Sequence, residues 1–101
     1  MVLARAVFQA KFGKVNELVA AFKEMNNGMT AAQMESVQPR ILTDISGPFN
    51  TVVVETTHES LAALEQFRAA LFASMAEDPE GQSQVPDLVE SGRNEYYTIE
   101  L

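Results

Sequence analysis

The fold of this chain is decided by the stretch Arg40–Thr56, which reads RILTDISGPFNTVVVET. Its two ends, Arg40–Ser46 and Asn50–Thr56, are rich in β-branched residues and predict two strands. The linking residues Gly47–Phe49 have the composition of a turn and are too few for a crossover helix. The two strands must therefore pair antiparallel, as a hairpin.

Amphipathic helices are predicted on both sides of this hairpin. The helix before it ends at the stop signal Asn26–Gly28, whose residues tolerate the left-handed conformation, and its apolar face carries Val15, Leu18, Val19, Phe22 and Met25. The helix after the hairpin has an apolar face of Leu61, Leu64, Phe67, Leu71, Phe72 and Met75.

A short helix is predicted between Gly28 and the hairpin. Thr30 and Gln33 have the spacing of a capping box, and this helix would end near Val37. The alternative is one longer helix that continues through Gly28.

The two ends of the chain complete the set of elements. Val2–Ala10 and the alternating Glu95–Leu101 predict a first and a last strand. Between the second long helix and the last strand, Pro79–Ser83 predicts one helical turn. Pro86–Ser91 predicts a short helix that Gly92 stops.

The order strand, helix, strand, strand, helix, strand predicts an α+β fold of the ferredoxin-like type. In that βαββαβ arrangement, right-handed crossovers place both helices on one face of a four-stranded antiparallel sheet. A chain of 101 residues is too short for two cores, so residues 1–101 are expected to form a single domain.

The strands are apolar at consecutive positions, notably in Val52–Val54, Ile41–Leu42 and Val7–Phe8. Consecutive residues of a strand point to opposite faces, so both faces of the sheet carry apolar side chains. Leaving such a row in water forfeits about 1.5–3 kcal/mol per side chain. Since the helices cover one face only, the sequence predicts a homodimer in which a second sheet closes an eight-stranded barrel.

Composition excludes several classes of protein. A formal net charge of −7 argues against binding to nucleic acid or to an anionic membrane surface. Cysteine is absent, and His58 is the only histidine, so neither a metal site nor another cofactor is expected. Met1–Ala10 does not have the form of a secretory signal, because Arg5 interrupts its short apolar stretch. A cytoplasmic location is therefore expected.

The chain resembles the NIPSNAP-like proteins of the dimeric α/β-barrel superfamily. The residues that carry this resemblance are Phe12-Gly13-Lys14, Arg40–Thr43, Gly47–Glu55, Glu59-Ser60-Leu61 and Glu90–Glu95. The resemblance implies a ferredoxin-like protomer and a dimer, and in many relatives it implies no established activity. Related barrel families include cofactor-independent monooxygenases that act on aromatic substrates.

Two residues are the candidates for acid–base chemistry, if the protein is an enzyme. His58 follows the third strand and has an ordinary pKa near neutrality. The alternative is that His58 is an exposed loop or helix-capping residue. Tyr96 and its neighbour Tyr97 point to opposite faces of the last strand, so one is expected under the helices and the other toward the barrel interior or the dimer seam. In a monooxygenase, His58 or Tyr96 would transfer protons while the aromatic substrate supplies the electrons.

Charged residues interrupt the otherwise apolar strands at Arg5, Arg40, Asp44 and Glu55. Buried charges are costly unless they are paired. These residues therefore either sit in water at strand ends, or converge in the barrel as ion pairs or ligand contacts. The expected function is binding of a small apolar or aromatic molecule between sheet and partner, with Arg5, Arg40, Glu55, Tyr96 and Tyr97 as contacts. A monooxygenase and a purely structural dimer are the alternatives.

Overall fold

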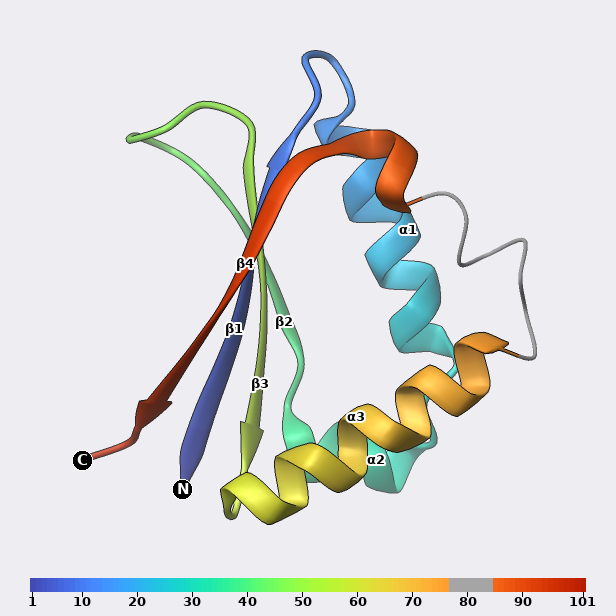
Figure 1. Cartoon of the computed structure of the whole chain (residues 1–101), viewed down its shortest axis with the longest axis vertical. Helices are drawn as coiled ribbons and strands as arrows, with labels where there is room; N and C mark the ends of the chain where they lie inside the picture. The colour runs from blue at the N-terminus through green and yellow to red at the C-terminus, as the bar shows by residue number, and fades with distance from the viewer. Residues whose placement is uncertain (77–84) are drawn as a thin grey trace.

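The chain folds as a four-stranded antiparallel sheet with its helices on one side, as the computed structural model shows (Figure 1). The structure describes residues 1–76 and 85–101. Its elements are β1 (Val2–Ala10), α1 (Val15–Asn27), α2 (Ala31–Val37), β2 (Arg40–Thr43), β3 (Thr51–His58), α3 (Leu61–Ala76) and β4 (Val89–Thr98). A further helical turn covers residues 85–88.

The strand order β2-β3-β1-β4 confirms the ferredoxin-like prediction. The predicted hairpin is present: β2 pairs antiparallel with β3, with Arg40 opposite Glu55 and Thr43 opposite Val52. Strand β1 lies in the centre of the sheet and pairs antiparallel with both β3 and β4. Two strands that are far apart in the sequence, β1 and β4, thus become neighbours.

The helices that precede the hairpin are those expected. Helix α1 ends at Asn27, but Gly28 has a φ of −76°, so the stop does not use the left-handed conformation that we predicted. The capping box of α2 is confirmed: the Gln33 backbone N–H donates to Thr30 Oγ1 at 3.2 Å, and the Thr30 N–H donates to Gln33 Oε1 at 2.8 Å. Residue Gln38 then takes the left-handed conformation, with a φ of 46°, and turns the chain into β2.

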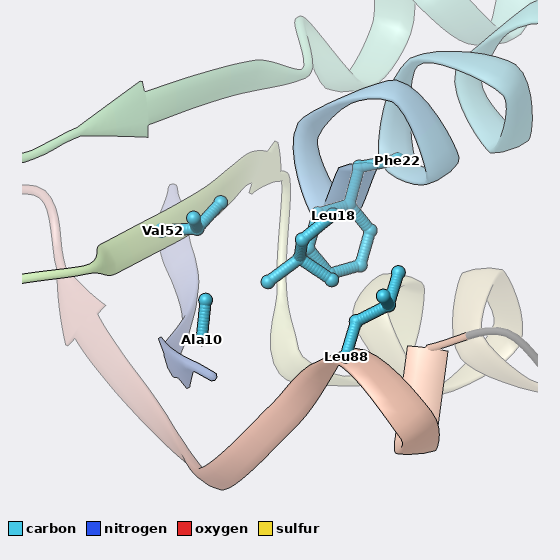
Figure 2. Packing of buried hydrophobic residues seen from close by; sticks show 5 residues of the cluster. All are labelled: Ala10, Leu18, Phe22, Val52 and Leu88. Atoms are coloured by element: carbon cyan, nitrogen blue, oxygen red, sulfur yellow. The ribbon is translucent and has the colours of Figure 1, made fainter. Parts of the chain in front are cut away.

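The core lies between the sheet and α1, as Figure 2 shows. Leu18 and Phe22 point from α1 toward Val52 on β3 and Ala10 on β1, and Leu88 closes the cluster from the helical turn before β4. The Phe22 ring also packs against the ring of Phe8, with centroids 5.1 Å apart. Burial of these apolar side chains is what holds α1 on the sheet.

Some boundaries differ from those predicted. Strand β2 ends at Thr43, since the Asp44 carboxylate accepts a 2.9 Å hydrogen bond from the Thr51 N–H and closes the loop. Strand β4 begins at Val89 and ends at Thr98, so Gly92 lies within a strand and does not stop a helix. The predicted turn at 79–83 lies outside the described residues.

The early start of β4 comes from a contact that is distant in the sequence. Gly92 lies opposite Phe8, and a Cβ at Gly92 would be only 2.8 Å from Phe8 Cδ1. Gly92 therefore lets the Phe8 ring lie against the backbone of β4, which a local reading of the sequence cannot show.

Strand β4 carries a bulge near its start. Gln9 lies opposite Ser91, but Ala10 lies opposite Val89, so Glu90 is an extra residue without a partner on β1. The bulge turns Val89 toward the core, where it packs against the buried cluster.

Candidate functional site

The two faces of the sheet have different neighbours. Phe8, Val52, Val54 and Ile41 pack against the core below the helices, so they define the helix-covered face. The residues next to them in the sequence point the opposite way. We call that opposite side the open face, because no element among the described residues packs over it (Figure 1).

A row of alternating charges crosses the open face at one level. The register places Arg40 of β2, Glu55 of β3, Arg5 of β1 and Glu95 of β4 side by side. We call these four residues the charge row. Read across the sheet from β2 to β4, its charges are positive, negative, positive and negative.

Glu55 lies at the centre of the ion pairs in this row. Arg40 Nη2 donates to its Oε1, and Arg5 Nε lies 2.9 Å from its Oε2. The Glu55 side chain is only 8% exposed, whereas that of Arg40 is 65% exposed. Arg5 Nε is buried, and its contact with Glu55 lacks hydrogen-bond geometry, so their attraction is electrostatic. One carboxylate thus pairs with two guanidinium groups in a largely buried position.

Glu95 ends the row and has three partners. Its carboxylate accepts hydrogen bonds from Arg93 Nε at 2.8 Å and from the Tyr97 hydroxyl at 2.9 Å, and Arg5 Nη1 donates at 3.3 Å. The hydrogen bond from Arg93 is the largest cause that holds the pKa of Glu95 below its ordinary value, followed by that from Tyr97. With Arg93 included, the face carries three arginines and two glutamates, so one positive charge is in excess.

A pocket of about 490 Å³ adjoins the β2 end of the charge row. Its lining combines the guanidinium of Arg40 with polar and apolar side chains from α2, the connection to β2, and β3: Met34, Gln38, Pro39 and Thr57. The lining is mainly polar, and Met34 and Pro39 form its apolar part beside the exposed positive charge of Arg40. This volume lies within the range of small-molecule sites.

His58 is not the exposed residue that the sequence offered as the alternative to an acid–base role. His58 is the last residue of β3 and is 4% exposed, so it is neither a loop residue nor a helix cap in water. Its Nε2 lies 2.7 Å from Thr56 Oγ1, and its ring packs against Phe67 of α3, with centroids 5.1 Å apart. Burial lowers the pKa of His58 from its ordinary value, because the protonated ring is poorly solvated there.

The prediction that the two neighbouring tyrosines point to opposite faces is confirmed. Tyr96 lies on the helix-covered side, where Arg68 of α3 donates to its hydroxyl and stacks on its ring. Tyr97 lies on the open face, in contact with Glu95. Of the predicted ligand contacts, the structure brings together Arg5, Arg40, Glu55 and Tyr97, and it separates Tyr96 and His58 from them.

Six residues of this region were not among the predicted site residues: Arg93, Glu95 and the pocket-lining Met34, Gln38, Pro39 and Thr57. Glu95 and Arg93 stand at alternate positions of the last strand, and this alternation is the signal that could have found them. Met34 and Pro39 join the pocket only because α2 folds over the end of β2, so no local pattern marks them. Asp44, which we grouped with the strand charges, lies beyond β2 and accepts the hydrogen bond from Thr51.

Within residues 1–76 and 85–101, no three His, Cys, Asp or Glu side chains form a group that could hold a metal ion. The helices of that same part of the chain are all too short or too polar to cross a membrane.

Comparisons with known proteins were made by sequence and by structure. No protein-family model matches the chain, and neither does any curated protein sequence. Solved structures do match. A NIPSNAP-like domain protein from Burkholderia xenovorans has a TM-score of 0.73 and 20% identity, over 97% of this chain and 84% of that protein. A NIPSNAP family protein from Agrobacterium tumefaciens has a TM-score of 0.69 and 20% identity, over 96% and 90% of the two chains.

A third similar structure carries a functional description. It is a candidate antibiotic biosynthesis monooxygenase from Nitrosomonas europaea, with a TM-score of 0.68 and 14% identity over 100% of both chains. At these identities the likeness shows the fold. The chain is thus an α+β protomer of the ferredoxin-like class. More particularly, it has the fold of the NIPSNAP structures, which confirms the protomer fold that the resemblance implied.

Proposed function

We propose that this protein is a homodimeric α/β barrel that binds a small molecule with an apolar or aromatic body and an acidic group. The observation that carries the proposal is the pocket beside Arg40, where an exposed guanidinium lies next to the apolar side chains of Met34 and Pro39. Because Arg40 uses Nη2 for Glu55, the rest of its donor fork is free to take a carboxylate or phenolate.

The charge on the open face favours an anion. Glu55 offsets Arg5 and Arg40, and Glu95 is shared by Arg5 and Arg93, which leaves one positive charge in excess. A ligand carrying one negative charge would balance the face, and an isolated cation would add to the excess. Met34 and Pro39 then suit the apolar body of the ligand.

The homodimer accounts for the apolar residues of the open face. Leu42 is half-exposed there, beside Val7 and Val53, which side chains of the same protomer already bury. The loop between β2 and β3 extends on the side away from the helices and carries Ile45 and Phe49, which are both largely exposed (Figure 1). A second sheet on this side would shield these groups from water.

Ligand binding is tested with small acids of known structure. We expect 2-naphthoate and salicylate to raise the melting temperature and to bind measurably by calorimetry, whereas benzyl alcohol and benzylamine do not. Arg40→Gln should weaken 2-naphthoate binding at least about tenfold, since a charge-assisted hydrogen bond is worth about 1.5–3 kcal/mol. Met34→Ala should weaken it less, through loss of apolar contact.

The matched control is Lys14→Gln. Lys14 is also exposed and paired with a glutamate, but it lies on the loop before α1. This variant should bind 2-naphthoate as the wild type does. If a folded wild-type protein binds none of the acids at millimolar concentration, or if Arg40→Gln binds them unchanged, the ligand proposal fails and a structural dimer is favoured.

Monooxygenation of an aromatic substrate is the second candidate, and the fold likeness to the candidate monooxygenase from Nitrosomonas europaea favours it. Its acid–base residues would be His58 or Tyr96, which lie on the helix-covered side. Oxygen uptake with hydroquinone or anthrone tests this function. We expect uptake to fall at least about tenfold in His58→Gln or Tyr96→Phe if the residue transfers a proton. Absence of uptake by the wild type would exclude it for these substrates.

A further inference from the structure

Gln38, at the junction of α2 and β2, has a backbone conformation that glutamine rarely adopts. Its φ is 46° and its ψ is 62°, which lie in the left-handed region. Glycine favours this region, and asparagine tolerates it because its short side chain can hydrogen-bond to the nearby backbone. In the described part of the chain, Asn50 is the other residue besides glycine with a positive φ. Asparagine is ordinary at such a position, so Gln38 is the exception.

The residue that follows restricts Gln38 further. Pro39 comes next, and contact with a proline ring drives the preceding residue toward an extended conformation. Gln38 nevertheless turns the chain, and its backbone N–H donates to the Met34 carbonyl at 2.9 Å, which closes α2. Glycine would make the same turn and the same hydrogen bond with less strain. The backbone of this junction therefore does not account for a glutamine.

The side chain of Gln38 lies where a ligand is proposed to bind. Gln38 is exposed and lines the pocket together with Arg40 and with Thr57 of β3. Strained backbone conformations are found preferentially at ligand-binding sites, where the side chain they position is used. A glutamine side chain offers a hydrogen-bond donor and an acceptor, which the guanidinium of Arg40 does not.

We propose that Gln38 determines specificity, in that its side-chain amide binds a hydroxyl group next to the acid group that Arg40 holds. This inference rests on the proposed function and narrows its ligand class from aromatic acids in general to aromatic hydroxy acids. In such an acid the hydroxyl hydrogen bonds to the adjacent carboxylate, so the hydroxyl oxygen accepts from the amide N–H of Gln38.

The spacing of the two residues suits neighbouring groups on one ligand. Only Pro39 separates Gln38 from Arg40, and the proline ring holds its own φ near about −65°. The two side chains therefore start from a short and rigid piece of backbone at the edge of one pocket. Such preorganisation lowers the entropy that is lost when both side chains bind the same molecule.

The test compares two acids that differ by a single hydroxyl group, 2-naphthoate and 3-hydroxy-2-naphthoate. We expect the wild type to bind 3-hydroxy-2-naphthoate at least about threefold more tightly, which is the range of one hydrogen bond. Gln38→Met keeps the length of the side chain and the backbone strain but has no amide. Its preference for the hydroxy acid should fall below about 1.5-fold, while it binds 2-naphthoate as the wild type does. Calorimetry measures both dissociation constants.

Gln38→Gly separates the side chain of residue 38 from its backbone. This variant lacks the amide and also relieves the strain, so its melting temperature should rise by about 2–5 °C while the preference for the hydroxy acid is lost. A purely structural role of Gln38 does not produce a protein that is more stable and less selective. Asn50→Gly is the matched control, because Asn50 is left-handed too but does not line the pocket, and it should keep the full preference.

Thr57→Val tests the other uncharged polar side chain of the pocket. It should keep at least half of the wild-type preference, since the proposal assigns the hydroxyl group to Gln38. If Thr57→Val loses the preference, or if Gln38→Met or Gln38→Gly keeps it, the role of Gln38 is wrong. It is also wrong if Gln38→Gly melts no higher than the wild type, because glutamine would then be kept there at no cost.

The wild type distinguishes this inference from the proposed function. If it binds both naphthoates equally well, the selective role of Gln38 is overturned, whereas binding of aromatic acids beside Arg40 stands. If it binds neither acid at millimolar concentration, the proposed function fails and the role of Gln38 fails with it.

Discussion

The helix-covered face of the sheet is held by apolar packing, whereas the open face is organised by charge. On the covered face, Leu18 and Val52 are completely buried in a cluster with Phe22. On the open face, ion pairs link all four strands through Glu55 and Arg5. Apolar packing has no direction and tolerates shifts, whereas an ion-pair row fixes a register. One face therefore supplies most of the stability of the protomer, and the other fixes the register of the four strands.

The largest expected effect comes from truncating the core of the covered face. Phe22→Ala should lower the free energy of unfolding by about 3–5 kcal/mol, because it leaves a cavity between α1 and the Phe8 ring. Urea denaturation at one fixed protein concentration measures this loss. Phe12→Ala is the control, since Phe12 is 92% exposed, and it should change stability by less than about 0.5 kcal/mol. If both variants lose the same free energy of unfolding, apolar packing under the helices is not what holds the protomer together.

Removal of the central charge of the open face should have an intermediate effect. Glu55→Gln leaves Arg5 and Arg40 without their shared counter-charge. We therefore expect the free energy of unfolding to fall by about 2 kcal/mol. The same denaturation assay applies, with the exposed Glu65→Gln of α3 as the control. If Glu55→Gln is as stable as the wild type, the charge row contributes nothing to the stability of the protomer.

A smaller effect is expected where β4 meets the covered face. Gly92→Ala places a Cβ within 2.8 Å of the Phe8 ring, which must shift. We expect this overpacking to lower the free energy of unfolding by about 1 kcal/mol. Phe8→Leu should remove part of the Gly92→Ala penalty in the double variant, because the smaller side chain frees the space. If the stability losses of the two single variants simply add in the double variant, the Phe8 ring is not what the new Cβ meets.

The smallest effect is a pH dependence that belongs to His58 on the covered face. Its folded-state pKa is lowered below 6.5, so the unfolded chain binds the proton more readily. This contribution to stability is complete above pH 6.5 and is lost as the pH falls toward the folded-state pKa. The stability difference between wild type and His58→Gln should therefore decrease between about pH 7 and about pH 5. A difference independent of pH would show that the ring titrates normally.

The order of strands and helices followed from local patterns, but several boundaries and burials did not. The hairpin, α1 and the capping box of α2 each depend on neighbours within a few residues, and they were predicted from the sequence. His58 is buried because α3 folds back over the end of β3, and Gly92 is in a strand because Phe8 lies against it. Gly92 and Phe8 are far apart in the sequence, and the contact between His58 and Phe67 depends on how α3 folds back over β3, so local patterns show neither.

The candidate site was predictable only in part, for the same reason. Arg5, Arg40 and Glu55 stand out as charges within apolar strands, and the structure brings all three together. Their alignment depends on strand register, since a shift of one residue would send Glu55 to the other face. Tyr96 and Tyr97 confirm that adjacent residues of a strand point to opposite faces of the sheet, which the sequence does allow one to predict.

The bulge at the start of β4 has a consequence for how this chain can vary in length. Glu90 is the one extra residue there, and a chain without it would keep Val89 opposite Ala10 and Ser91 opposite Gln9 in an unbroken ladder. Every residue of β4 after Glu90 would keep the face of the sheet to which it points. Evolutionary gain or loss of a single residue is thus neutral for the architecture at this junction, and we expect homologues to differ in length there more often than within β1 or β3.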